Sequence, residues 1–294
     1  MEHLLKIITK PDNVPIVLML LLIIYYTWLA MSKAAKNDRQ ELSEEAKQAD
    51  KVQVWPYLVK VEFLGALVVM VILTFWSFLL DAPLEEPANP ALTPNPSKAP
   101  WYFLGLQEIL VYFDPWIAGV LVPTFIIMGL CAIPYIDINP KGNGYYTFKE
   151  RKFAILTFCF GFLLLWISLI VLGTFFRGPG WNLFLPWEYW DTHRVVALTN
   201  IDFTELFGIP TRLVDDSLNP VAMLFGSVVV LAWYGIGVVY YFMKHNTDFM
   251  KKMGPIRYAI TTFLFLTMMA VPIKIILRLT LNVKYILVTP FFNI

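Results

Sequence analysis

Six long apolar runs dominate this chain, and more polar connections separate them. A helix that crosses the hydrocarbon core of a bilayer needs about 20 mostly apolar residues. Six runs meet this requirement and are predicted to span a membrane: Val14–Met31, Tyr57–Leu80, Trp116–Pro134, Phe153–Phe176, Pro220–Met243 and Arg257–Arg278. The pattern therefore predicts an all-α polytopic membrane protein with six transmembrane helices.

Composition supports this fold class. The 294 residues are 58% hydrophobic and only 15% charged, whereas a soluble domain is about half apolar and about a quarter charged. The formal net charge of +1 provides no basic field for a nucleic-acid partner. Cys131 and Cys159 lie inside apolar runs and are expected to be small buried hydrophobes; a disulfide would require their two helices to touch. No CxxCH occurs, so no c-type haem attached by this signature is expected.

The basic residues predict an orientation. Most of the 23 lysines and arginines follow the first, third and fifth spans. Because cytoplasmic connections of membrane proteins carry the excess of Lys and Arg, these three connections are predicted to be cytoplasmic. Both ends of the chain, and the connections after the second and fourth spans, are therefore expected on the outer, periplasmic side.

A proline-rich stretch lies between the second and third spans and ends in an aromatic segment, Pro100–Phe103, named here the PWYF segment. Proline is tolerated in the first turn of a helix, and Trp and Tyr favour the headgroup level of a membrane. A second break follows at Asp114-Pro115. The sequence predicts a short interfacial helix that starts at Trp101, on the outer side.

The predicted spans carry few ionisable residues. Glu62 lies near the start of the second span, and Lys274 and Arg278 lie near the end of the sixth, where each is expected to reach an interface by snorkelling. Transporters usually place ionisable groups mid-membrane, so a transporter or channel subunit is the weaker interpretation. The histidines His3, His193 and His245 lie outside the spans. The chain is therefore expected to provide no haem ligands and no metal site.

The connection after the fourth span is rich in aromatic residues between Trp181 and Arg194. Two interpretations stay open for it. It is either an interfacial aromatic belt or a docking surface for an extrinsic redox subunit.

The order of residues around the PWYF segment resembles the quinol-oxidation loop of the cytochrome b family. Lys98, two residues and then Trp101–Leu104 correspond to the family pattern K-P-E-W-Y-F-L. "LEEPANPALTPNPSKAPWYFLGLQEIL" and "WIAGVLVPTFIIMGLCAIPYID" look like the loop and following helix of subunit IV of cytochrome b6f complexes. The resemblance covers about Trp55–Arg177.

One departure from the family pattern concerns the proton. The family glutamate before the tryptophan, thought to bind the quinol and accept its proton, is Pro100 here, and the family proline is Ala99. Glu108 lies two helical turns after Trp101 and is the nearest substitute. We therefore hypothesise that Glu108 is the catalytic proton acceptor. The alternative is that it points to water or pairs with a partner subunit.

The resemblance also implies a quinol-binding wall and a set of partners. The expected quinol-binding residues are Pro100, Trp101, Tyr102, Phe103, Leu104, Gln107 and Ile109. Menaquinol or ubiquinol would be the substrate, and haem b and an iron–sulfur cluster would belong to partner subunits. These partners would be a haem-b cytochrome b6-like subunit and a Rieske-type iron–sulfur or cytochrome c subunit, in a lipid-embedded complex that is itself a dimer.

The resemblance predicts a subunit of a quinol:cytochrome c, or other acceptor, oxidoreductase, inactive alone, in a prokaryotic-type energy-transducing membrane. Three parts are predicted: an additional N-terminal span with a cytoplasmic linker over residues 1–54, the subunit IV-like region over 55–177, and the outer connection with two further spans over 178–294. The alternative function is a structural membrane anchor of a redox complex, with a non-catalytic quinol loop.

Overall fold

The computed structural model describes residues 2–40, 43–49, 51–81, 87–139, 146–197 and 199–294. Pro83 and Glu86, at the start of the proline-rich approach, lie outside the described residues. Within the described ranges the chain is helical and forms only isolated β-bridges. It is an all-α polytopic membrane protein.

Six helical segments are long and apolar enough to cross a membrane, which confirms the predicted spans. They are Val14–Arg39, Val54–Leu79, Ile117–Ile136, Phe148–Phe176, Pro220–Lys244 and Asp248–Leu281. The first and last are much longer than predicted because polar turns continue the helix beyond the apolar run. In the last segment, Gly254 has φ 71° and bends the helix just before Pro255, so the predicted start of the span at Arg257 lies close to this bend.

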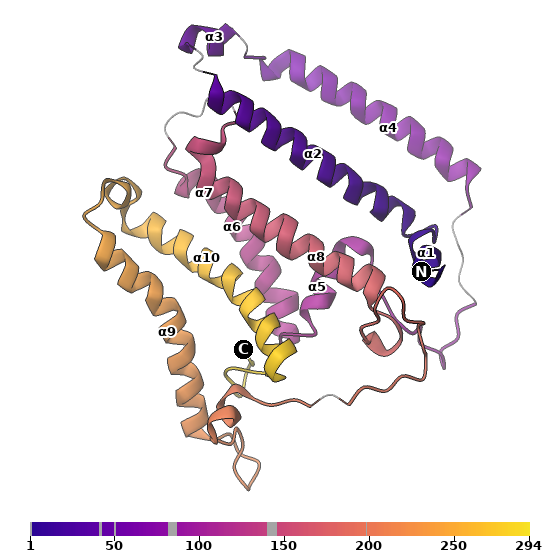
Figure 1. The fold of residues 1–294 in the computed structure, drawn as a ribbon, viewed down its shortest axis with the longest axis vertical. Helices are drawn as coiled ribbons and strands as arrows, with labels where there is room; N and C mark the ends of the chain where they lie inside the picture. The colour runs from indigo at the N-terminus through magenta and orange to yellow at the C-terminus, as the bar shows by residue number, and fades with distance from the viewer. Residues whose placement is uncertain (1, 41–42, 50, 82–86, 140–145, 198) are drawn as a thin grey trace. The chain divides into compact units, whose positions relative to one another are not determined.

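The chain forms two compact units, drawn as ribbons in Figure 1. One comprises Leu5–Pro94 and Gly142–Ile155. Its helical elements are most of α1 (Glu2–Ile8), α2 (Val14–Arg39), α3 (Glu44–Ala49), η1 (Val54–Leu58), α4 (Val59–Leu79) and the first part of α7 (Phe148–Phe158). Asn37 Nδ2 donates to the Tyr146 carbonyl, and the Lys149 amide donates to Asp38, so the end of α2 holds the start of α7. No residue of α4 is buried by the described chain.

The other unit comprises Met1–Leu4, Asn95–Lys141 and Leu156–Ile294. Its remaining elements are η2 (Trp101–Phe103), α5 (Leu104–Ile109), η3 (Ile117–Leu121), α6 (Val122–Ile136), η4 (Cys159–Trp166), α8 (Ile167–Val171), η5 (Leu172–Phe176), η6 (Pro179–Trp181), η7 (Phe203–Phe207), α9 (Pro220–Lys244) and α10 (Asp248–Leu281). Elements η2 and α5 form the short helix predicted after the proline-rich approach. The predicted three-part division of the chain follows a different criterion from these compact units and stays a prediction.

Helices α9 and α10 form an antiparallel pair, visible in Figure 1. Gly237 permits the close approach, since a Cβ there would lie 2.5 Å from Thr262 Cγ2. Trp233 Nε1 donates to the Leu266 carbonyl at 3.1 Å, and Tyr258 OH donates to the Gly237 carbonyl at 2.7 Å. Small residues and interhelical hydrogen bonds are what holds helices together in lipid, where no hydrophobic drive acts between them.

The two cations near the end of α10 contact neighbouring segments of the chain. The Lys274 side chain is buried, and Nζ donates to the Lys284 carbonyl in the segment that follows α10, while its snorkelling to an interface stays a prediction. Arg278 donates to Asn200 Oδ1 at 2.6 Å. Lys274 thus binds the segment that follows α10, and Arg278 binds the segment that precedes α9. Cys131 is exposed rather than buried, because the described part of the chain leaves that face of α6 uncovered.

Candidate functional site

The short helix η2–α5 packs against the last turns of the fourth span. Glycines on both sides allow this close contact: a Cβ on Gly105 would lie 3.1 Å from Trp166 Cε2, and one on Gly173 would lie 3.4 Å from Leu104 Cβ. Ile109 and Tyr112 are buried in one apolar cluster with Ala118 and Leu169. The packing therefore fixes which face of α5 points inward and which stays uncovered.

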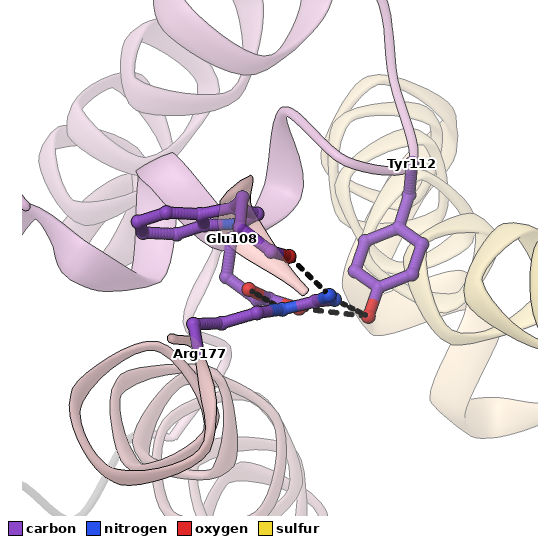
Figure 2. Close-up of polar contacts among 4 residues, drawn as sticks. Glu108, Tyr112 and Arg177 are labelled. Atoms are coloured by element: carbon purple, nitrogen blue, oxygen red, sulfur yellow. Dashed lines mark hydrogen bonds and ion pairs between the residues drawn. The ribbon is translucent and has the colours of Figure 1, made fainter. Parts of the chain in front are cut away.

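The inward face carries a buried carboxylate with its complete set of partners (Figure 2). Glu108 is 0% exposed. Arg177 approaches it as a fork, with Nη2 donating to Oε1 at 2.6 Å and Nε donating to Oε2 at 2.9 Å. Tyr112 OH donates to Oε1 at 2.9 Å. Arg177 Nη1 donates to the Trp181 carbonyl, also at 2.9 Å.

This network is a charge-assisted, bidentate contact of the strongest kind found between side chains. Burial, followed by the charge of Glu108 and the hydrogen bond to it, raises the pKa of the Tyr112 phenol above its ordinary value, so Tyr112 stays a neutral donor. Burial on its own lowers the pKa of the Arg177 guanidinium, but the hydrogen bond and charge of Glu108 outweigh it and raise that pKa overall. Arg177 is therefore held as a guanidinium, and Tyr112 stays protonated.

A second set of polar contacts fastens the approach to the PWYF segment. Gln107 Nε2 donates to the Ser97 carbonyl at 2.9 Å, and Gln107 Oε1 accepts from the Ala99 amide at 2.8 Å. Lys98 Nζ donates to the Thr174 carbonyl at 2.8 Å. The Gln107 amide thus holds the backbone that leads into Pro100, and its expected place in a quinol pocket stays a prediction.

The PWYF segment itself lies on the uncovered face. Trp101, Tyr102 and Phe103 are 37%, 49% and 51% exposed, and their rings contact one another in sequence. Pro100 is exposed as well. Leu104 and Ile109, also predicted to bind quinol, are buried against the fourth span and its neighbours. The structure thus separates the predicted site residues into an exposed aromatic group and a buried supporting group.

The structure contradicts the alternative in which Glu108 points to water or pairs with a partner subunit, and its role as proton acceptor stays a prediction. Glu108 does not point to water, and its partner lies in its own chain, 69 residues away in sequence. Sequence reasoning missed Arg177 and Tyr112 as members of the site. The sequence contains a feature that points to Arg177 as a partner of Glu108: Arg177 directly follows the fourth span and lies on the same predicted side of the membrane.

Among the described residues, no group of three or more His, Cys, Asp or Glu side chains is arranged to hold a metal ion. The three histidines of the sequence lie outside the six spans, so they do not fit the paired ligands that a haem between helices requires.

The family model described as cytochrome b(C-terminal)/b6/petD matches residues 87–175. This stretch contains the PWYF segment, α5 and most of the fourth span. The chain contains a cytochrome b C-terminal-like region. Arg177 lies just beyond the matched stretch, so the Glu108–Arg177 pair joins this region to the connection that follows the fourth span.

A curated relative agrees with this match. The chain is 28% identical to the cytochrome b of Cyanidium caldarium over 125 residues, which cover 40% of this chain and 32% of that protein. The chain therefore spans about a third of the length of this relative. No solved structure matches the chain significantly.

Proposed function

We propose that this chain is the subunit IV-like part of a split cytochrome b in a respiratory quinol-oxidising complex. A quinol would bind between the PWYF segment and a separate haem-b subunit, at the outer face of the membrane. There it would lose two protons and two electrons, and the electrons would pass to redox groups of the haem-b subunit and of an iron–sulfur or cytochrome subunit. The chain contributes a wall of the pocket and no redox group of its own.

The observation that carries this proposal is the exposed aromatic face of Trp101–Phe103, together with the hydrogen bonds that fix the backbone beneath it. Three consecutive aromatic side chains are left uncovered by the described chain. The backbone beneath them is held by the Gln107 amide on one side and by the Glu108–Arg177 pair on the other. Ligand pockets are mostly apolar and largely preformed, and an immobile aromatic wall suits the flat ring of a quinol.

Glu108 remains our candidate for the proton acceptor, and the structure sets a condition on that role. A general base needs hydrogen-bond reach to the proton it takes. Glu108 is enclosed, so the fork of Arg177 or the hydroxyl of Tyr112 would have to move when quinol binds. Tyr112, which donates to Glu108, is the group through which a proton could be relayed.

A second candidate function is a structural anchor subunit of a redox complex. Two observations favour it: Pro100 stands where the family has its glutamate, and the substitute carboxylate is already fully paired. In this case the buried pair only positions α5, and the aromatic face contacts a partner subunit instead of a quinol.

The two functions are separated by assaying quinol-driven reduction of the acceptor by the intact complex. The complex purified through this chain should contain a haem-b subunit and oxidise quinol. Replacing Trp101 by Leu should lower turnover while the subunits stay assembled. An assembled complex that lacks haem b, or whose turnover is unaffected by this change, would favour the anchor function.

The role of Glu108 needs a charge-balanced control. Glu108→Gln alone leaves Arg177 buried without its partner, so a loss of turnover could come from misfolding. The double variant Glu108→Gln/Arg177→Gln removes both charges. If Glu108 accepts the proton, the double variant assembles but stays inactive. Recovery of turnover in the double variant would assign Glu108 to positioning only.

A further inference from the structure

The chain turns back on itself directly after the fourth span. An isolated bridge pairs Arg177 with Leu183, the Gly178 amide donates to the Asn182 carbonyl at 3.0 Å, and the Phe184 amide donates to the Phe176 carbonyl at 2.9 Å. Phe176 is the last residue of the span. The hairpin therefore returns Phe184 to the level at which the span ends.

This return is fixed by packing as well as by hydrogen bonds. The Phe184 side chain is fully buried and contacts the ring of Trp190. A Cβ on Gly178 would lie only 2.7 Å from the Phe184 ring, so the hairpin can close only because residue 178 has no side chain. The residues that follow Phe184 consequently start from a defined depth.

Those residues form a rigid turn. The Glu188 amide donates to the Leu185 carbonyl at 2.9 Å, and the Leu185 amide donates to the Glu188 carboxylate at 2.8 Å. Arg194 pairs with the same carboxylate at 3.4 Å. The hydrogen bond from the Leu185 amide is the main cause that lowers the pKa of Glu188, so the turn carries a carboxylate and a guanidinium that balance each other.

The turn presents large apolar side chains outward. Trp187 and Tyr189 are 72% and 77% exposed, and Leu185 is exposed too. We propose that Leu185, Trp187 and Tyr189 are a membrane-interface anchor, which inserts into the lipid headgroup region at the end of the fourth span. This proposal concerns a surface apart from the PWYF segment and does not depend on quinol oxidation.

Depth and chemistry together favour lipid as the occupant. The turn begins at the level where the hydrocarbon-spanning helix ends, and Trp and Tyr prefer this level because their rings are amphipathic. The preformed turn holds the side chains in place, so little conformational freedom is lost on insertion. Glu188 and Arg194 form an ion pair and Asp191 is a second acidic residue beside the turn, so insertion should not require anionic headgroups.

A nitroxide label on the turn, named here the tip (residues 185–189), reports whether these side chains lie in lipid. The full chain, in its complex, is reconstituted in bilayer nanodiscs with Cys131 and Cys159 replaced by Ala, and a single cysteine is introduced as Trp187→Cys or, separately, Tyr189→Cys. The matched control is Val214→Cys, which lies in an exposed turn beside Asp215 and Asp216 and is expected in water. Collision of each label with oxygen and with a water-soluble nickel chelate is measured.

The anchor predicts a several-fold higher ratio of oxygen to nickel collisions at 187 and 189 than at 214, in neutral as well as in anionic lipid. Equal ratios at all three positions would place the tip in water and overturn the proposal. Low accessibility to both reagents at 187 and 189 would mean that a protein subunit covers the tip, and would overturn it equally. Two labelling positions guard against one substitution that disturbs the turn.

Discussion

The aromatic PWYF segment and Glu108, which belongs to the Glu108–Tyr112–Arg177 cluster, are neighbours on the short helix η2–α5, yet their side chains have opposite surroundings. Every charged group of the cluster has its partner inside the chain, with the carboxylate of Glu108 accepting from both Arg177 and Tyr112. The aromatic rings of Trp101–Phe103 contact one another, and about a third to a half of each side chain is exposed.

This difference assigns the two regions different tasks. Burying an ion pair is costly unless its geometry is complete, and a complete pair mainly fixes one arrangement of the elements that carry it. An uncovered aromatic face is available to a ligand or a partner. We infer that the cluster sets the position of α5 and that the aromatic face makes the outside contact. The predictions below separate these tasks by their effects on stability and on turnover.

The largest effect on stability is expected from Glu108→Gln. This change leaves the Arg177 guanidinium buried and unpaired, which typically costs about 3–5 kcal/mol. Thermal unfolding of the chain, measured in detergent, should report the loss. The double variant Glu108→Gln/Arg177→Gln should lose clearly less stability, because no uncompensated charge remains buried. A single variant as stable as the unaltered chain would show that the pair does not hold α5.

A smaller effect is expected where α5 packs on the fourth span. Gly105→Ala places a methyl group 3.1 Å from the Trp166 ring, so the ring or the helix must shift. Such overpacking typically costs about 1–3 kcal/mol. Gly119→Ala is the matched control, since a Cβ there meets nothing within 4 Å. Similar melting temperatures for the two variants would argue against tight seating of α5.

The Gln107 amide should contribute less again. Gln107→Leu removes the hydrogen bonds to Ser97 and Ala99, and each such bond contributes about 0.5–1.5 kcal/mol. We expect a stability loss of about 1–2 kcal/mol, together with faster limited proteolysis between Asn95 and Pro100, because the approach is released. Unchanged proteolysis would indicate that the Lys98 contact alone secures this segment.

The smallest effect on stability, and a clear effect on function, is expected from Trp101→Leu. Its side chain is partly exposed, and surface changes usually alter stability by about 0.5 kcal/mol or less. Quinol turnover by the complex should nevertheless fall, with KM for quinol raised. A large drop in melting temperature without a change in KM would mean that Trp101 stabilises the fold and does not contact quinol, which contradicts the task that we assign to it.

The sequence could predict those parts of the fold that depend on local pattern. Spans follow from apolar length, and the helix that starts at Trp101 follows from the proline before it and the aromatic residues after it. The apolar run predicts the part of α10 between Arg257 and Arg278. It does not predict the bend at Gly254.

The partners of Glu108 and Gln107 could not be predicted in the same way. The Arg177 fork joins residues 69 apart, and only the seating of α5 against the fourth span brings them together. Local spacing placed Glu108 on the face of Trp101, but the 3-10 turn at Trp101–Phe103 and the glycine-mediated packing turn the carboxylate inward. Charge complementarity on one side of the membrane was the available clue, and it does not specify geometry.

The central claim, that the aromatic face forms a wall of a quinol pocket, is tested most directly by photolabelling. The intact complex is illuminated with an azido-quinone, and the labelled peptides of this chain are mapped. The proposal predicts label within Trp101–Phe103, displaced by an excess of unlabelled quinone. A complex that oxidises quinol but takes up displaceable label only outside this segment would contradict it.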